Sequence, residues 1–218
     1  MAELDQERIA AAALAVVDER GARGFTMRAV ADALGVTPMA LYYHVADKSA
    51  LVGLVLDAAL GERPLPHPTG DWQGDLWELS RWVRESSRAH PELAKLNREH
   101  VWTPTMLRVA ERWVGIWQQS GLQLEAAIQA ATVSSLAIYG YVDAEAKAHE
   151  IQWPDDEMLA WLPNARLLYR SGHNPEVVFE LMVRALITGL HAQFAPESAE
   201  ANRPVQPGVR RREAHAER

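Results

Sequence analysis

The sequence contains 218 residues, of which 48% are hydrophobic and 23% are charged, and it has no cysteine. This composition is typical of a soluble globular protein with a sizeable core, and it excludes a disulfide framework, a thiolate zinc site and a cysteine nucleophile. The net charge of −7 argues against binding of polyanions over the whole surface but leaves room for a local nucleic-acid site.

The first ten residues, MAELDQERIA, do not resemble a secretory signal, because no basic segment precedes an apolar run. No apolar stretch of the sequence approaches the length of a membrane span. We therefore expect a cytoplasmic protein that does not cross a membrane.

Helical periodicity dominates the sequence and no stretch alternates like a strand, so we expect an all-α fold. The first 60 residues hold four short helices. A threonine or an aspartate can cap the last three, and Pro38 suits the first helical position of the third. The ranges expected for these helices are 5–20, 26–34, 37–45 and 47–60.

A stretch rich in proline and glycine, GERPLPHPTGDW at 61–72, breaks the helical pattern and predicts a boundary between two units. Residues 195–218 have no periodicity and few large apolar side chains, which is typical of a disordered tail. The expected organisation is a small unit at 1–60, a linker at 61–72, a larger unit at 73–194 and a tail at 195–218.

The larger unit is expected to be a helical bundle. One helix ends near His90, and a short helical turn follows at 92–99. Another helix opens at Thr103 and Pro104, which repeat the pattern of a cap followed by proline, and it ends before Gly121.

Two segments of the larger unit, 124–150 and 175–194, are apolar on more than one face, so each buries more than one side. Between them, a helix is expected to begin after Pro154. The two long helices are either the centre of a monomeric bundle or half of a four-helix interface in a homodimer. We favour the homodimer.

The second and third helices of the small unit, joined by a tight turn at Gly35, have the spacing of a helix-turn-helix. On the third helix, Leu41 and Val45 share one face and are expected to pack inward. The outer face and its flanks carry Pro38, Met39, Ala40, Tyr42, Tyr43 and His44. Aromatic side chains on an exposed helix indicate a binding surface.

Residues 9–60 resemble the TetR family of bacterial regulators. The resemblance is carried by Gly24, Phe25, TMRAVADALGV at 26–36, LYYHV at 41–45, Asp47, Lys48 and Leu51. It is closest to the tetracycline-repressor branch in LYYHVADKSALV. The resemblance implies a DNA-binding domain at 1–60 and a larger domain at 73–194 that binds a ligand and forms a dimer.

The resemblance also implies which side chains face DNA. Those residues are Thr26, Arg28, Thr37, Tyr42, Tyr43, His44 and Lys48, and the outward positions of the third helix add Pro38, Met39 and Ala40. The three added residues and Tyr42 offer apolar contacts to thymine methyl groups, although Tyr42 could instead pack within its own domain.

The polar members of the set have physical roles and plainer alternatives. Thr26 and Thr37 lie at helix N-termini, which favour a phosphate oxygen, but both act as caps in any case. Lys48 and the Tyr43 hydroxyl group can reach backbone phosphates. Arg28 can fork across guanine O6 and N7, contact a phosphate, or pair with an aspartate four residues on. His44 faces DNA or caps the C-terminus of its own helix.

The charge of the small unit departs from the usual basic footprint of a DNA-binding domain. Residues 1–60 contain five basic side chains and eight acidic ones. We therefore expect a shallow salt dependence, with roughly two to four phosphates neutralised per subunit. A dimer that reads two half-sites about 34–36 Å apart would double these contacts.

The larger domain offers aromatic side chains for a small-molecule pocket. The candidates are Trp82, His100, Trp102, Trp113, Trp117 and Tyr139. Core packing is the alternative, since tryptophan on a helical stripe is common in cores. As a set, these residues favour an effector that is largely apolar, flat or aromatic.

No cofactor, metal site or catalytic site is predicted. The histidines at 90 and 100 are too far apart for a tight ligand spacing. The serines at 134 and 135 lack a glycine-flanked nucleophile elbow, and no phosphate-binding loop occurs.

The sequence thus predicts a homodimeric transcriptional repressor, without enzymatic activity, that leaves a two-fold symmetric DNA operator when a small effector binds. One alternative is an all-α binding or enzymatic protein whose helix-turn-helix contacts a partner protein rather than DNA. Another is a DNA-binding dimer that has no effector.

Overall fold

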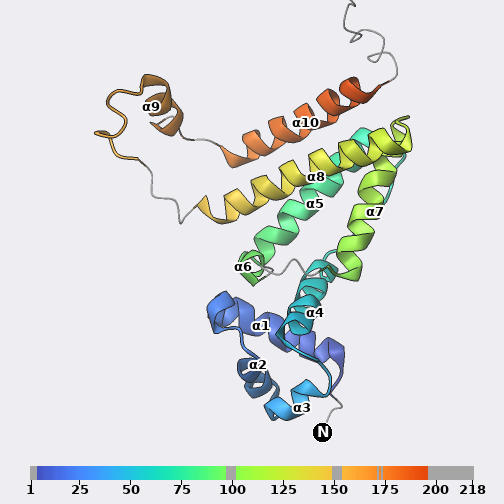
Figure 1. Ribbon diagram of the computed structural model, residues 1–218, viewed down its shortest axis with the longest axis vertical. Helices are drawn as coiled ribbons and strands as arrows, with labels where there is room; N and C mark the ends of the chain where they lie inside the picture. Colours follow the sequence, from blue (N-terminus) through green and yellow to red (C-terminus); the bar gives the residue numbers. More distant parts are fainter. Residues whose placement is uncertain (1–3, 97–101, 149–153, 171, 173, 196–218) are drawn as a thin grey trace, which may run out of the picture.

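The computed structural model describes residues 4–96, 102–148, 154–170, 172 and 174–195. Helices dominate these residues and none of them lies in a strand, which confirms the all-α prediction. Apart from Ala195, the tail predicted at 195–218 lies outside the described residues. Figure 1 shows a small group of helices at one end of the molecule and a larger group at the other.

The small group consists of α1 (Gln6–Gly24), α2 (Met27–Leu34), α3 (Pro38–Tyr42) and α4 (Lys48–Gly61). Its core is formed by buried apolar side chains of all four helices, among them Ile9, Val17, Val30, Leu41, Leu51 and Val55, together with Phe25 between α1 and α2. Each helix begins where a short polar side chain accepts a hydrogen bond from a backbone N–H group of the first turn: Asp5, Thr26, Thr37 and Asp47.

Two helix ends differ from the sequence prediction. Helix α1 continues to Gly24, and the predicted stop at Gly21 is a kink in which this residue has φ 66°. Helix α3 ends at Tyr42, but the turn is closed further along, because the N–H groups of His44 and Val45 both donate to the carbonyl oxygen of Leu41 at 3.0 Å.

The larger group consists of α5 (Trp72–Ala89), α6 (Leu93–Leu96), α7 (Pro104–Gln119), α8 (Leu124–Ala146), α9 (Pro163–Arg170) and α10 (Pro175–Phe194). A second core lies between α5, α7, α8 and α10, with Leu79, Trp113, Trp117, Ile138, Phe179 and Val183 among its buried members. Thr103 and Asn174 cap α7 and α10 as the sequence indicates.

The two cores are separate, but the smaller one takes one buried residue from beyond the linker. Leu93 of α6 packs with the side chains of α1 to α4. Helix α6 lies where the lower end of α5 approaches α1 (Figure 1). The domain boundary at 61–72 stays a prediction. The sequence did not predict that Leu93, which lies beyond this boundary, belongs to the smaller core.

Residues 154–170, which include α9, form an arm that lies apart from the helical bundle (Figure 1). The helix expected after Pro154 begins later than predicted, because residues 156–161 form turns and α9 begins at Pro163. Asp155 accepts a hydrogen bond from the N–H group of Met158 at 2.9 Å, so it caps a turn. Trp161 is 90% exposed on this arm.

Candidate nucleic-acid interface and effector domain

The helix-turn-helix places its apolar and aromatic side chains as the periodicity predicts. Leu41 and Val45 are buried, whereas the exposed fractions of Met39, Tyr42 and Tyr43 are 68%, 48% and 84%. Helix α3 lies at the end of the molecule farthest from α8 and α10 (Figure 1). This face is therefore free to meet a partner as large as a DNA duplex.

The two threonines at the helix N-termini are exposed and already act as acceptors. The hydroxyl oxygen of Thr26 accepts from the N–H group of Ala29 at 3.0 Å, and that of Thr37 accepts from Ala40 at 3.2 Å. Each hydroxyl group still has its own O–H to donate. A phosphate oxygen is an acceptor that fits this remaining capacity.

The cationic candidates also lie at the surface. Arg28 is exposed, and among the described residues no ion pair joins it to Asp32. Lys48 is exposed in the first turn of α4, and its Nζ lies 5.8 Å from the centre of the Phe25 ring. This contact holds the lysine stem against the core while the ammonium group stays in water. Pro38 and His44 are exposed, and Ala40 is half-buried.

Several acidic side chains of the small unit are occupied away from this face. Asp5 and Asp47 cap α1 and α4. Asp57 accepts a hydrogen bond from the N–H group of Thr105, at the start of α7, at 2.9 Å. Burial opposes ionisation of Asp57, but its hydrogen bonds with the threonines of that turn outweigh burial and hold its pKa below the ordinary value. Some of the acidic side chains of this unit therefore bind the N-termini of its own helices or the larger unit, and not the candidate DNA face.

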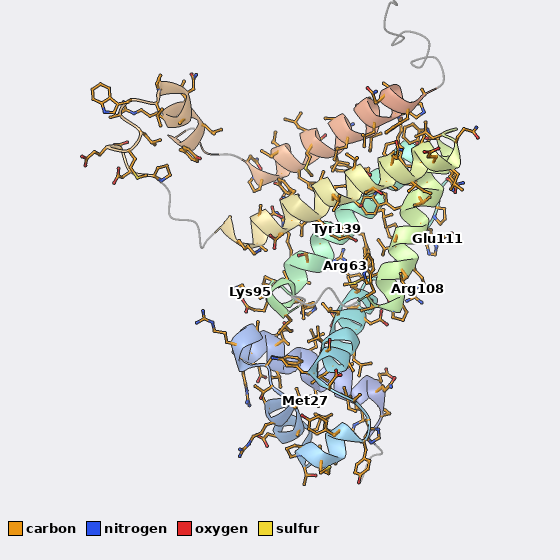
Figure 2. All side chains as sticks on the ribbon, in the orientation of Figure 1. Met27, Arg63, Lys95, Arg108, Glu111 and Tyr139 are labelled. Atoms are coloured by element: carbon orange, nitrogen blue, oxygen red, sulfur yellow. The ribbon has the colours of Figure 1, made fainter. Side chains whose placement is uncertain are left out.

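Besides the apolar packing of Leu93, three sets of hydrogen bonds between described residues link the small unit to the larger one. The first is the bond between Asp57 and the start of α7. The second joins Glu92 to α1, because its Oε2 accepts the N–H group of Ala22 at 3.0 Å. The third joins the His90 ring to Asp18 of α1 and to Glu62 at the end of α4. Figure 2 shows Lys95, on α6, close to this junction.

Two of the predicted effector residues are core tryptophans with satisfied donors. Trp113 and Trp117 are buried, and both indole N–H groups donate to the hydroxyl oxygen of Ser134, at 3.0 and 3.1 Å. That hydroxyl group donates in turn to the carbonyl oxygen of Ala130 at 2.7 Å. Tyr139 is 46% exposed, and the centre of its ring lies 6.4 Å from that of Trp113.

The other predicted effector residues have different surroundings. Trp82 is buried, donates its indole N–H to the carbonyl oxygen of Arg63 at 3.2 Å, and lines a cavity of about 240 Å³. That cavity is also lined by Glu62, Arg63, Pro64, Pro66, Glu78, Arg81 and Glu85. Trp102 is 67% exposed, and His100 lies outside the described residues. The structure thus places Trp82, Trp113 and Trp117 in one core, with Tyr139 beside Trp113, and the indole N–H of Trp82 is directed at the linker.

No group of three or more histidine, aspartate or glutamate side chains that could hold a metal ion occurs in the described part of the chain. The predicted set of effector residues is aromatic in character, and it supplies no metal ligand cluster there.

An ionic cluster centred on the buried side chain of Arg84, which the sequence did not indicate, joins α5, α8 and α10. The guanidinium group of Arg84 donates to Glu145 at 2.6 and 2.9 Å and to Glu176 at 2.7 Å, with its side chain only 3% exposed. It also stacks 4.4 Å from the centre of the Phe179 ring. The hydrogen bonds with Glu145 and Glu176 raise the pKa of Arg84 in spite of its burial. Arg88 binds the same two glutamates.

Helices α8 and α10 lie side by side (Figure 1), and several of their large apolar side chains are exposed. The exposed apolar residues of these two helices are Leu124, Ile128, Val133, Leu136, Tyr139, Val177 and Leu181. On α8, positions 124, 128, 132 and 136 repeat every fourth residue and so form one stripe. We call these seven residues the α8–α10 face.

By length and composition, α10 could cross a membrane, and it alone passes this test among the described residues. Only 17% of its apolar window is buried. A single helix of this kind is weak evidence for a membrane span, because a helix that packs against another protein passes the same test.

Comparison with known proteins gives matches over both units. Residues 9–55 match the family described as "Bacterial regulatory proteins, tetR family", and residues 64–194 match "Tetracyclin repressor-like, C-terminal domain". The tetracycline repressor protein class E of Escherichia coli is 25% identical over 214 residues, which cover 95% of this chain and 99% of that protein. The HTH-type transcriptional repressor DrrR1 of Streptomyces coeruleorubidus is 29% identical over 154 residues, which cover 68% of this chain and 55% of that protein.

Solved structures show the same arrangement. The TetR family protein ActR of Streptomyces coelicolor, in complex with actinorhodin, superposes with a TM-score of 0.73 at 26% identity, covering 90% of this chain and 100% of that one. The structure of the same protein in complex with (S)-DNPA gives a TM-score of 0.71 at 27% identity, covering 89% and 100% of the two chains.

Proposed function

Because the chain belongs to the TetR family of DNA-binding transcriptional regulators, which are not enzymes, we propose that it is a homodimeric repressor released from a two-fold symmetric operator by an aromatic effector. The observation that carries the DNA-binding part is the exposed face of α3. Met39 and Tyr43 have no core to cover there, and a helix-turn-helix offers that position to the major groove.

On the proposed DNA face, contacts divide into those that position the protein and those that read bases. Thr26, Thr37, Tyr43 and Lys48 supply donors for phosphate oxygens, which fix register. The apolar side chains at 38–40, with Tyr42, lie against thymine methyl groups, and Arg28 contacts guanine or a phosphate. His44 lies at the flank of the same face.

Homodimerisation is proposed through the α8–α10 face. Large apolar side chains such as Leu136 and Leu181 are 67% and 63% exposed in the single chain, and burying them in a partner's identical face would remove this surface from water. Two helices from each subunit would form a four-helix interface. The dimer also compensates for the small number of cations on each DNA-binding unit.

The effector domain is proposed to bind a largely apolar, aromatic small molecule. Relatives are tetracycline repressors, and ActR binds actinorhodin in its solved complex. In this chain, Trp113, Trp117 and Tyr139 lie together on α7 and α8, which supports the proposal of an aromatic effector. Trp82, Trp102 and His100 stay further candidates for contact with the effector.

Release from DNA is proposed to follow from a shift between two conformers. The effector favours the one in which α4 has swung and the two recognition helices no longer fit half-sites one turn apart. Asp57 provides a direct link for this motion, because it binds the first turn of α7 from α4. A thousandfold loss of operator affinity requires a coupling of about 4 kcal/mol over the two subunits.

The experiment that tests the DNA-binding proposal compares Tyr43→Ala with the wild-type protein on a two-fold symmetric fragment from the promoter of its own gene. Tyr43→Ala should weaken binding by about tenfold or more while the dimer stays intact, because one positioning contact is lost in each half-site. Leu107→Ala is the matched control, since Leu107 is a 57% exposed apolar residue on α7, outside the helix-turn-helix. Unchanged affinity of Tyr43→Ala would refute this assignment.

Two further measurements distinguish this proposal from protein recognition by the helix-turn-helix and from a DNA-binding dimer that has no effector. Failure to bind any promoter fragment, together with capture of a protein partner that Tyr43→Ala loses, would favour protein recognition by the helix-turn-helix. Thermal denaturation in a panel of aromatic compounds tests the effector, because a compound that binds the native state raises the melting temperature. Trp113→Ala should then change the dose response more than the operator affinity.

A further inference from the structure

His90 lies directly after α5, where the larger unit meets α1 and α4. Its ring is placed between two carboxylates of the small unit. Nδ1 is 3.1 Å from both carboxylate oxygens of Asp18 on α1, and Nε2 is 2.9 Å from Oε2 of Glu62, the residue that follows α4. The His90 side chain is only 10% exposed, so water competes little for either nitrogen.

The placement of a carboxylate at each ring nitrogen favours the protonated form of His90. A neutral imidazole carries one N–H group, so its other nitrogen would direct a lone pair at a carboxylate. The imidazolium ion donates from both nitrogens and satisfies Asp18 and Glu62 together. Burial of the ring lowers the pKa of His90, but the hydrogen bonds with Glu62 and Asp18 outweigh burial and bring the pKa above its ordinary value of 6.5.

The other groups at this junction do not change charge near neutral pH. Glu92 accepts the N–H group of Ala22 on α1 and pairs with Lys95 at 2.7 Å. On α4, Asp57 binds the start of α7. Carboxylates and lysines ordinarily keep their charge between about pH 6 and pH 9, whereas histidine titrates in that range. Among these contacts, the one made by His90 is therefore the pH-sensitive one.

We propose that protonated His90 is an ion-pair latch that holds the DNA-binding unit in its operator-binding arrangement, so that deprotonation favours release from DNA. The proposal rests on the repressor function proposed above and makes the proton a second effector. The ion pairs of His90 stabilise this arrangement fully when the pH is below the ordinary pKa of histidine. This stabilisation is lost as the pH rises through the raised pKa that His90 has in this arrangement. By linkage, the small-molecule effector should then bind more tightly at higher pH.

The expected size of the effect follows from the exposure of the partners. The side chains of Asp18 and Glu62 are 43% and 52% exposed. One ion pair whose carboxylate is exposed to this extent changes an equilibrium constant by up to about fivefold. Losing both pairs should weaken operator binding by about three- to tenfold per subunit between about pH 6 and about pH 8.5.

The test measures operator affinity of the full-length protein over this pH range at constant ionic strength, using the promoter fragment described above. Wild type should weaken as the pH rises, and His90→Gln should lose most of that dependence. His67→Gln is the matched control, because His67 is an exposed histidine of the linker, and it should behave as wild type. Asp18→Asn and Glu62→Gln change exposed carboxylates and should each reduce the pH dependence.

A second measurement does not depend on DNA. An NMR titration of the His90 ring in the DNA-free protein should give a midpoint above 6.5, and Asp18→Asn and Glu62→Gln should lower it. This separates His90 from His44, which lies on the proposed DNA face. A wild-type pH dependence in His90→Gln, or a His90 midpoint at or below the ordinary value, would overturn the latch. Loss of operator binding at every pH in the wild type would instead overturn the repressor function, and the titration would still decide whether the latch exists.

Discussion

A charge on the α8–α10 face should separate the two subunits without unfolding either of them. We choose Leu181→Asp, because Leu181 is 63% exposed on α10 in the single chain and has little role in the core of its own subunit. The dimer proposal places this side chain against the partner, so the aspartate would be buried beside apolar groups when the subunits associate.

The size of the effect can be worked out from the exposed fraction. Full burial of a leucine side chain is worth about 1.5–3 kcal/mol, so burying the exposed part of Leu181 is worth about 1–2 kcal/mol. A two-fold interface contains the residue twice, which gives about 2–4 kcal/mol, or about 30- to 700-fold in the dimer dissociation constant. Desolvation of the carboxylate adds to this loss.

Sedimentation over a range of protein concentrations measures the dissociation constant directly. Leu107→Asp is the control, because it places the same charge on an exposed leucine of α7 outside the α8–α10 face. Helical circular dichroism should be the same in both variants. A Leu181→Asp dimer as tight as wild type would refute the assignment of this face.

Three further predictions concern the contacts that hold the single chain together. Arg84→Ala should lower the free energy of unfolding by about 1.5–3 kcal/mol in urea denaturation, because the charge-assisted hydrogen bonds of the buried guanidinium group are lost while Arg88 still binds both glutamates; a loss below about 1 kcal/mol would contradict a structural role of the cluster. Ser134→Ala should cost about 2–4 kcal/mol, because two buried indole N–H groups lose their acceptor, and the more exposed Ser135→Ala serves as its control. Asp57 has a pKa lowered from 3.8, so its contribution is present above that value and is lost as the pH falls through the lower folded-state pKa. Melting temperatures of Asp57→Asn should therefore fall less steeply than those of wild type below about pH 4, and parallel curves would exclude this role.

Local chemistry explains why so many helix starts could be predicted from the sequence. Thr26, Thr37, Asp47 and Thr103 each cap the helix that they precede, because the interaction joins residues only three positions apart. The inward and outward faces of α3 follow from the same short-range periodicity. For this reason the exposed positions of the candidate DNA face could be inferred before the fold was known.

Long-range contacts could not be predicted in this way. Arg84 meets Glu145 and Glu176, which are 61 and 92 residues away in the sequence, and no spacing rule links them. The sharing of Ser134 by two tryptophans depends on how α7 packs on α8. The sequence offered these tryptophans either as pocket residues or as core residues, and only the packing shows that Trp82, Trp113 and Trp117 are core residues with satisfied indole donors.

The presence of Leu93 in the core of the small unit limits how this protein can be divided. Leu93 is 8% exposed and packs with residues that all precede the linker, and the half-buried Leu96 and Met106 pack against the same core. A fragment ending at residue 60 would therefore expose an apolar surface that the intact chain covers. In chimaeras that exchange the DNA-binding unit between relatives, α6 should be transferred together with the DNA-binding unit of the same protein. A mismatched residue at position 93 would otherwise leave a cavity or a steric clash in the core beneath the recognition helix.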